Sequence, residues 1–93
     1  MKKTDIITSN HIEFLNFLKT QIPLYHKSNI FFRDIQYGVM EYFEKKKKTK
    51  VKYSEAEEIG REYTRFMEKK EIFKKLDHQT WVLHYPDFTK KAS

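Results

Sequence analysis

The chain has 93 residues, enough for one small domain and too few for two. Its 19 Lys and Arg exceed its 13 Asp and Glu, which gives a formal net charge of +6. Aromatic residues make up 16% of the chain, a share that argues against disorder because rings bury much apolar area. The absence of Cys excludes a disulfide scaffold and Cys-ligated zinc.

No apolar run approaches the roughly 18 residues of a membrane-spanning helix. The N-terminus also lacks an apolar stretch long enough for a signal-peptide core. We therefore expect a soluble, intracellular protein with a single domain over 1–93. The end segments 1–8 and 89–93 are expected to be flexible.

The first predicted helix begins at Asn10 and is stopped by Pro23. Asn10 would cap this helix, and Glu13 would complete a capping box. Its apolar residues cover more than a third of the helical wheel and are Phe14, Leu15, Phe17, Leu18 and Ile22. This wide stripe has two interpretations: a helix wedged centrally in the core, or a helix with one side in a homodimer interface.

A second helix is predicted to open at Ser28 or Asn29. Its apolar positions fall within about 120° of one another, as in an amphipathic helix, and are Phe31, Phe32, Ile35, Val39, Tyr42 and Phe43. Tyr37 and Met40 lie off this stripe, beside Arg33 and Glu44, and Tyr37 is a candidate for contact with a partner. Gly38 costs the helix roughly 1 kcal/mol relative to Ala, which the close approach of another helix would explain.

Lysines dominate the segment that follows. Six lysines occupy eight positions and are Lys45, Lys46, Lys47, Lys48, Lys50 and Lys52. Alternating apolar and basic residues predict a very short strand or an extended link at about 50–53. Ser54 and Glu57 form a capping box for a third helix, which ends near 69–71. The apolar side of this helix consists of Ala56, Ile59, Gly60, Tyr63, Phe66 and Met67.

Alternating residues over 72–76 and 81–85 predict a β-hairpin around a four-residue loop at 77–80. Pro86 ends the second strand, and Phe88 is expected to fold back onto the sheet. Three helices, a short strand and a C-terminal hairpin make an α+β domain with the arrangement of a winged helix, in which the hairpin is the wing.

The segment 66–81 resembles the end of many winged-helix proteins, with a charged helix end, an apolar pair and a hairpin. A narrower resemblance, over roughly 30–85, is to DEP-type winged helices, in the helix 31–43, the helix start 54–61 and the aromatic strand 81–85. The chain departs from that family at Arg33 and Asp34, where a Gly is usual, and in its reduced segment 24–27. Most isolated winged helices bind nucleic acid, whereas DEP modules are adaptors for membranes or signalling proteins, and fold analogy alone does not choose between them.

Nothing in the sequence marks a catalytic centre, so we expect no enzyme, cofactor, metal or small-molecule substrate. The four His lack the i, i+4 spacing of a helical zinc site. His78 and His84 could approach each other within the hairpin, but ordinary surface histidines are the simpler interpretation. The glutamates over 55–62 cluster at a helix start, where the helix dipole already explains them.

Our first hypothesis is a transcription-regulatory homodimer that binds duplex DNA. The six lysines of 45–52, together with Lys74 and Lys75 of the wing, would neutralise phosphates, provided that both groups lie on a common side. Arg61 and Arg65 of the third helix would approach bases. The homodimer would form through the first helix and Tyr37.

The charge on the third helix favours a different partner. Its outward face carries four acids against three bases, which suits a solvated surface better than insertion into a groove. The alternative is therefore a DEP-like adaptor whose lysines bind an acidic protein or an anionic membrane. A third interpretation treats the lysine run only as solubilising surface.

Overall fold

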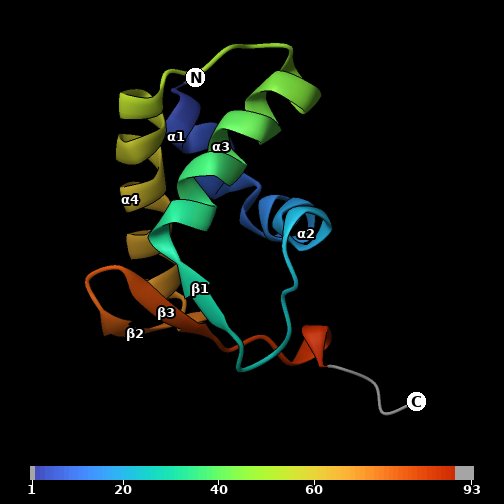
Figure 1. The fold of residues 1–93 in the computed structure, drawn as a ribbon, viewed down its shortest axis with the longest axis vertical. Helices are drawn as coiled ribbons and strands as arrows, with labels where there is room; N and C mark the ends of the chain where they lie inside the picture. Colours follow the sequence, from blue (N-terminus) through green and yellow to red (C-terminus); the bar gives the residue numbers. More distant parts are fainter. Residues whose placement is uncertain (1, 90–93) are drawn as a thin grey trace.

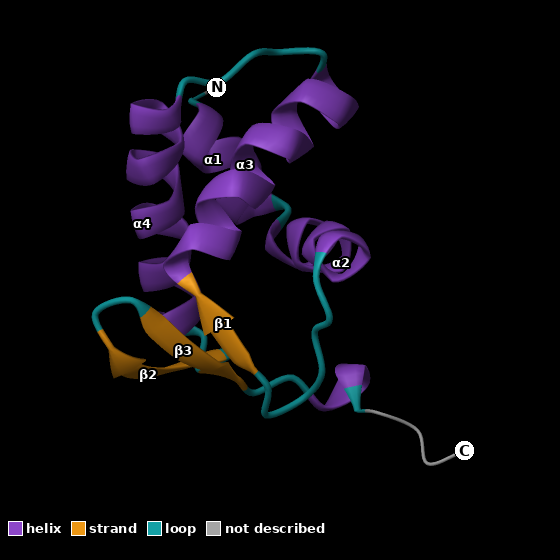
Figure 2. Ribbon diagram, viewed as in Figure 1, coloured by secondary structure: helices purple, strands orange, loops and turns teal. Residues whose placement is uncertain are grey.

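The computed structural model describes residues 2–89 (Figure 1). The elements in chain order are α1 (Lys3–Ser9), α2 (His11–Gln21), β1 (Asn29–Phe31), α3 (Phe32–Lys47), α4 (Tyr53–Lys69), β2 (Phe73–Asp77), β3 (Thr80–Leu83) and a 3₁₀ turn, η1 (Pro86–Phe88). Within these residues, four α-helices pack against one three-stranded antiparallel sheet, which confirms the predicted α+β class (Figure 2).

The three strands lie in the order β1-β3-β2, so the last strand within residues 2–89 is the central one. Ile30 pairs with Trp81, and Phe73 pairs with Leu83. All four side chains are buried, so one face of the sheet closes the core beneath the helices.

The N-terminal segment differs from the expectation of flexibility at 1–8. Lys3–Ser9 form α1, and Ile7 of this helix is fully buried. Lys3 Nζ donates to Glu55 Oε2 of α4 at 3.0 Å, which ties α1 to the start of that helix. A single buried isoleucine in a polar stretch gives no periodic signal, which is why the pattern missed this helix. Of the tail expected to be flexible at 89–93, residues 90–93 lie outside the described residues.

The third strand is not where the sequence predicted it. No strand forms at 50–53: residues 50–52 belong to the link between α3 and α4, which was the alternative prediction, and Tyr53 is the first residue of α4. Asn29–Phe31, predicted as the first turn of a helix, instead pair with β3 as β1. Phe31 consequently lies on the outer face, 50% exposed, rather than in the apolar stripe of α3. A strand this short depends on a distant partner and has no periodicity of its own.

Both predicted capping boxes were wrong. Asn10 occupies the N-cap position of α2 as predicted, but its side chain does not cap that helix: Nδ2 donates to the carbonyl of Ile6 in α1 at 2.8 Å. Lys52, rather than Ser54, occupies the N-cap position of α4, and no side chain caps that end. The second box was misplaced because the helix begins one residue before the serine.

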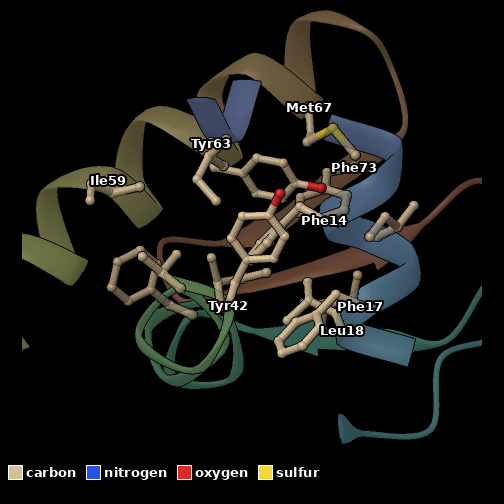
Figure 3. Packing of buried hydrophobic residues seen from close by; sticks show 14 of the residues in the cluster. Phe14, Phe17, Leu18, Tyr42, Ile59, Tyr63, Met67 and Phe73 are labelled. Atoms are coloured by element: carbon tan, nitrogen blue, oxygen red, sulfur yellow. The ribbon is translucent and has the colours of Figure 1, made fainter. Parts of the chain in front are cut away.

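Phe14 of α2 lies at the centre of the core (Figure 3). Its ring packs edge-on against Tyr42 of α3, with centroids 5.4 Å apart, and against Tyr63 of α4, at 4.8 Å. Leu15 and Leu18 are also fully buried. The wide stripe is therefore used inside the domain, as the central-helix interpretation expects, and a homodimer through α2 loses its basis.

Gly38 marks the crossing of α3 over α2, as predicted. A Cβ atom at this position would overlap Cδ2 of Leu18 and would lie 3.5 Å from Phe14 Cζ. The missing side chain thus lets the two helix backbones approach closely.

The predicted hairpin is confirmed as β2 and β3, with a turn of only His78 and Gln79 between them. Asp77 Oδ1 accepts a hydrogen bond from the Gln79 N–H at 2.8 Å, and this bond lowers the pKa of the carboxyl group. Phe88, which was expected to fold back onto the sheet, is buried in η1, and Lys19 Nζ of α2 lies 4.3 Å above its ring.

Candidate functional site

The lysine run surrounds the connection between α3 and α4, at the end of the molecule where α3 stops (Figure 1). Three lysines, Lys45, Lys46 and Lys47, form the last turn of α3, where the negative helix end favours cations. Lys48 ends that helix in the left-handed conformation, with φ 53°. Val51 is buried and anchors the connection, which leaves the lysine side chains around it exposed.

Most of this positive charge is uncompensated. Lys45 pairs with Glu41 at 3.3 Å. The other lysines of the run form no salt bridge within residues 2–89; we call these Lys46, Lys47, Lys48, Lys50 and Lys52 the lysine end. The Lys3–Glu55 bond brings the N-terminus of α1 to the same end, a contribution that the sequence analysis missed.

Lys74 and Lys75 of β2, the hairpin lysines, lie at the opposite end of α4 from the lysine end (Figure 1). The 17 residues of α4 span about 25 Å. Lys74 Nζ lies 3.4 Å from Glu71 Oε1, whereas Lys75 forms no salt bridge within the part of the chain that the structure describes. The two lysine groups are therefore separated along the length of α4, and the phosphate hypothesis requires that one anionic partner touch both from a common side.

The two arginines expected to approach bases are held by acids of their own helix. Arg61 pairs with Glu57 at 3.5 Å. The Arg61 guanidinium also lies 4.5 Å above the ring of Phe32. Arg65 pairs with Glu62 at 2.6 Å. Contact with a base would require either arginine to release its carboxylate, so the outward face of α4 behaves as a mixed-charge surface.

His84 lies beside His26, not beside His78. The two rings have centroids 5.1 Å apart, and the Tyr85 N–H donates to His26 Nδ1 at 3.0 Å. This bond joins the segment before β1 to the residues after β3. Burial, His84 and Lys27 together lower the pKa of His26, so the neutral ring is favoured.

The low pKa of His26 predicts a loss of stability in mild acid. Since the unfolded chain keeps the ordinary pKa near 6.5, it takes up a proton before the folded chain does. The free energy of unfolding should therefore be highest above pH 6.5 and fall as the pH drops below it. His26→Asn keeps a side-chain acceptor for the Tyr85 N–H without titrating, so urea titrations of this variant should show a flatter profile between pH 7 and 5. If the free energy of unfolding of this variant depends on pH as steeply as that of the unchanged protein, His26 is not the group responsible.

A surface recess of about 480 Å³ lies between α2 and the end of α3. It is lined by Glu13, Asn16, Phe17, Thr20, Gln21, Lys45 and Lys46. Tyr42 Oη donates to Glu13 Oε2 at 2.8 Å, and burial together with this contact raises the pKa of Tyr42 to about 12. The Tyr42 hydroxyl thus stays protonated and helps hold the fold together. No cluster of three or more metal-ligating side chains occurs among residues 2–89.

No protein-family model matches this sequence, and no curated protein or solved structure matches it. Over residues 2–89, none of the helices has the length and apolar character to cross a membrane. The arrangement of exposed charges is therefore the best guide to a ligand.

Proposed function

We propose that this chain is a non-enzymatic winged-helix module that binds duplex DNA through its phosphates and acts in transcription regulation. The element order supports the architecture, since α2, β1, α3, α4 and the β2–β3 hairpin follow one another and β1 pairs beside β3. In this assignment α3 and α4 form the helix-turn-helix pair, the hairpin is the wing, and α1 is an addition.

The observation that carries the proposal is that uncompensated lysines stand at both ends of α4. Cations near the two ends of a helix about 25 Å long can be engaged together by one long polyanion. The longest extent of the domain is 38 Å, close to the roughly 34–36 Å of one turn of duplex DNA. We therefore infer that one strip of phosphates runs along α4 and contacts both the lysine end and Lys75, which is the common side on which the hypothesis depends.

This binding mode makes phosphates the main contacts. Phosphate contacts position a protein on DNA without recognising the base sequence. Arg61 and Arg65, which lie between the two ends of α4, are paired with Glu57 and Glu62, and this pairing weakens their contact with bases. We therefore expect affinity to depend strongly on salt and only weakly on sequence.

Salt titration of DNA binding tests the proposal. Fluorescence anisotropy with a labelled duplex of about two turns should give a log–log slope near −0.9 per neutralised phosphate. Two variants each remove two charges, one at each end: Lys46→Ser with Lys47→Ser, and Lys74→Ser with Lys75→Ser. Each should flatten the slope by up to about 1.8.

The control, Lys19→Ser with Lys27→Asn, also removes two charges, one from α2 and one from the segment before β1, and leaves both lysine groups intact. It should leave the slope close to that of the unchanged protein. The proposal fails if the chain does not saturate at low salt, or if the control flattens the slope as much as the end variants do.

The adaptor remains a second candidate, because the glutamates on α4 repel phosphates over the face that would enter a groove. An anionic membrane would engage the lysine end without the hairpin lysines. Co-sedimentation with phosphatidylserine vesicles that is lost in the Lys46→Ser, Lys47→Ser variant, together with absent DNA binding, would favour the adaptor.

A further inference from the structure

An exposed row of side chains runs along the outward face of α3 at the spacing of a coiled-coil seam. The row, which we call the α3 seam, consists of Arg33, Tyr37, Met40 and Glu44, separated by four, three and four residues. Residues at this spacing share one face of a helix. The opposite face of α3 is buried in the core, so the seam is the side of this helix that remains available.

The centre of the seam is aromatic and apolar. Tyr37 is 48% exposed, and its ring lies 5.9 Å from the ring of Tyr53, which is 54% exposed. Met40 packs partly against the core beside them. Single exposed aromatic residues are ordinary, but two exposed rings in contact next to a methionine form a continuous apolar surface.

The two ends of the seam carry opposite charges. Arg33 lies 5.8 Å from the Tyr37 ring centroid, and neither Arg33 nor Glu44 forms a salt bridge within the described range 2–89. Eleven residues separate them along α3, a distance of about 16 Å. Glu41, another acid on α3, is paired with Lys45 of the same helix.

The charges and apolar side chains of the α3 seam are complementary to those of a second α3 helix that runs antiparallel to the first. A two-fold axis between Gly38 and Val39 sets Arg33 opposite the partner's Glu44, and Tyr37 opposite the partner's Met40. A parallel pairing would instead place each charge opposite its own kind. A recess of about 200 Å³ lies beside Tyr37 on the side of α2, and its other lining residues are Gln21, Ile22, Asp34, Gly38 and Glu41.

We propose that the α3 seam binds a second copy of this chain, with the two α3 helices antiparallel. The charge pattern identifies a second copy of the chain as the partner. In an antiparallel pair, Arg33 of each copy lies opposite Glu44 of the other. The homodimer contact expected at the first helix and Tyr37 thereby moves to α3, because the apolar stripe of α2 is buried. The proposal does not depend on DNA binding, and its test contains no DNA.

Charge reversal tests both the partner and its direction. In sedimentation equilibrium over increasing protein concentration, the unchanged chain should form dimers. Arg33→Glu places like charges opposite each other at two symmetric sites, so the dimer dissociation constant should rise about tenfold or more. Glu44→Arg should have the same effect. The double variant Arg33→Glu with Glu44→Arg restores both pairs in the reversed sense and should return to within about threefold of the unchanged chain.

Lys69→Glu is the matched control, because it changes the net charge as much as Arg33→Glu does but lies in the last turn of α4. It should leave the dissociation constant unchanged. The proposal is overturned if the chain is monomeric at every concentration, or if the double variant dimerises as weakly as the single ones. Circular dichroism of each variant confirms that the fold is intact, since all these side chains are exposed.

Discussion

Replacing Phe14 with alanine should cost the fold about 3–5 kcal/mol, as expected for truncating a buried aromatic side chain. The ring is fully buried and makes edge-on contacts with Tyr42 and Tyr63, so its removal opens a cavity between α2, α3 and α4. A domain of 93 residues has a total stability of roughly 5–14 kcal/mol, so this loss is a large fraction of the whole. Urea unfolding followed by far-ultraviolet circular dichroism measures it.

Phe31→Ala provides the matched control, because the same side-chain atoms are removed from a position that is 50% exposed. Its cost should stay below about 1 kcal/mol, since most of the area lost is already in water. Equal losses from the two variants would contradict the placement of Phe14 at the centre of the core and of Phe31 outside it.

Gly38→Ala should lower the free energy of unfolding by up to about 2 kcal/mol. Alanine improves helix propensity by about 1 kcal/mol, but overpacking a tight core costs about 1–3 kcal/mol. The overpacking cost should dominate, because the new Cβ overlaps Leu18, which is itself fully buried and has little room to move. Thermal and urea unfolding of the variant would measure the difference.

Gly60→Ala is the comparison for this substitution. Its Cβ would lie 3.3 Å from ring carbons of Phe32 and 3.4 Å from Ile35, tight distances without overlap. The gain in helix propensity should largely offset this crowding, so the change should stay within about 0.5 kcal/mol. If Gly60→Ala lowers the free energy of unfolding more than Gly38→Ala does, Gly38 is not the position of closest approach between helices.

The long helices could be predicted because they repeat an apolar face several times. Four turns of α3 and α4 carry that pattern, and a helix that buries one face must repeat it. In contrast, α1 has a single fully buried residue, Ile7, and β1 has only Ile30 facing the core. Neither element is stable without its distant partner, so local sequence carries too little information to predict it.

The candidate site was predictable in composition but not in arrangement. The lysine run and the hairpin lysines could be identified from the sequence, yet their separation depends on α4 lying between them as one uninterrupted helix. The contact of His26 with His84 joins residues that no spacing rule connects. The α3 seam was visible only in part, because Tyr37 and Met40 could be placed off the stripe while their exposure depends on the surrounding packing.

The central position of β3 governs how the domain can be made on a ribosome. β1 pairs only with β3, yet about fifty residues are synthesised between them. Until residues 80–83 have emerged from the exit tunnel, the backbone of β1 has no partner and Ile30 has no Trp81 against which to pack. The nascent chain can therefore form helices early, but closure of the domain must wait for its last strand, and growing chains halted before that point should be readily digested by proteases.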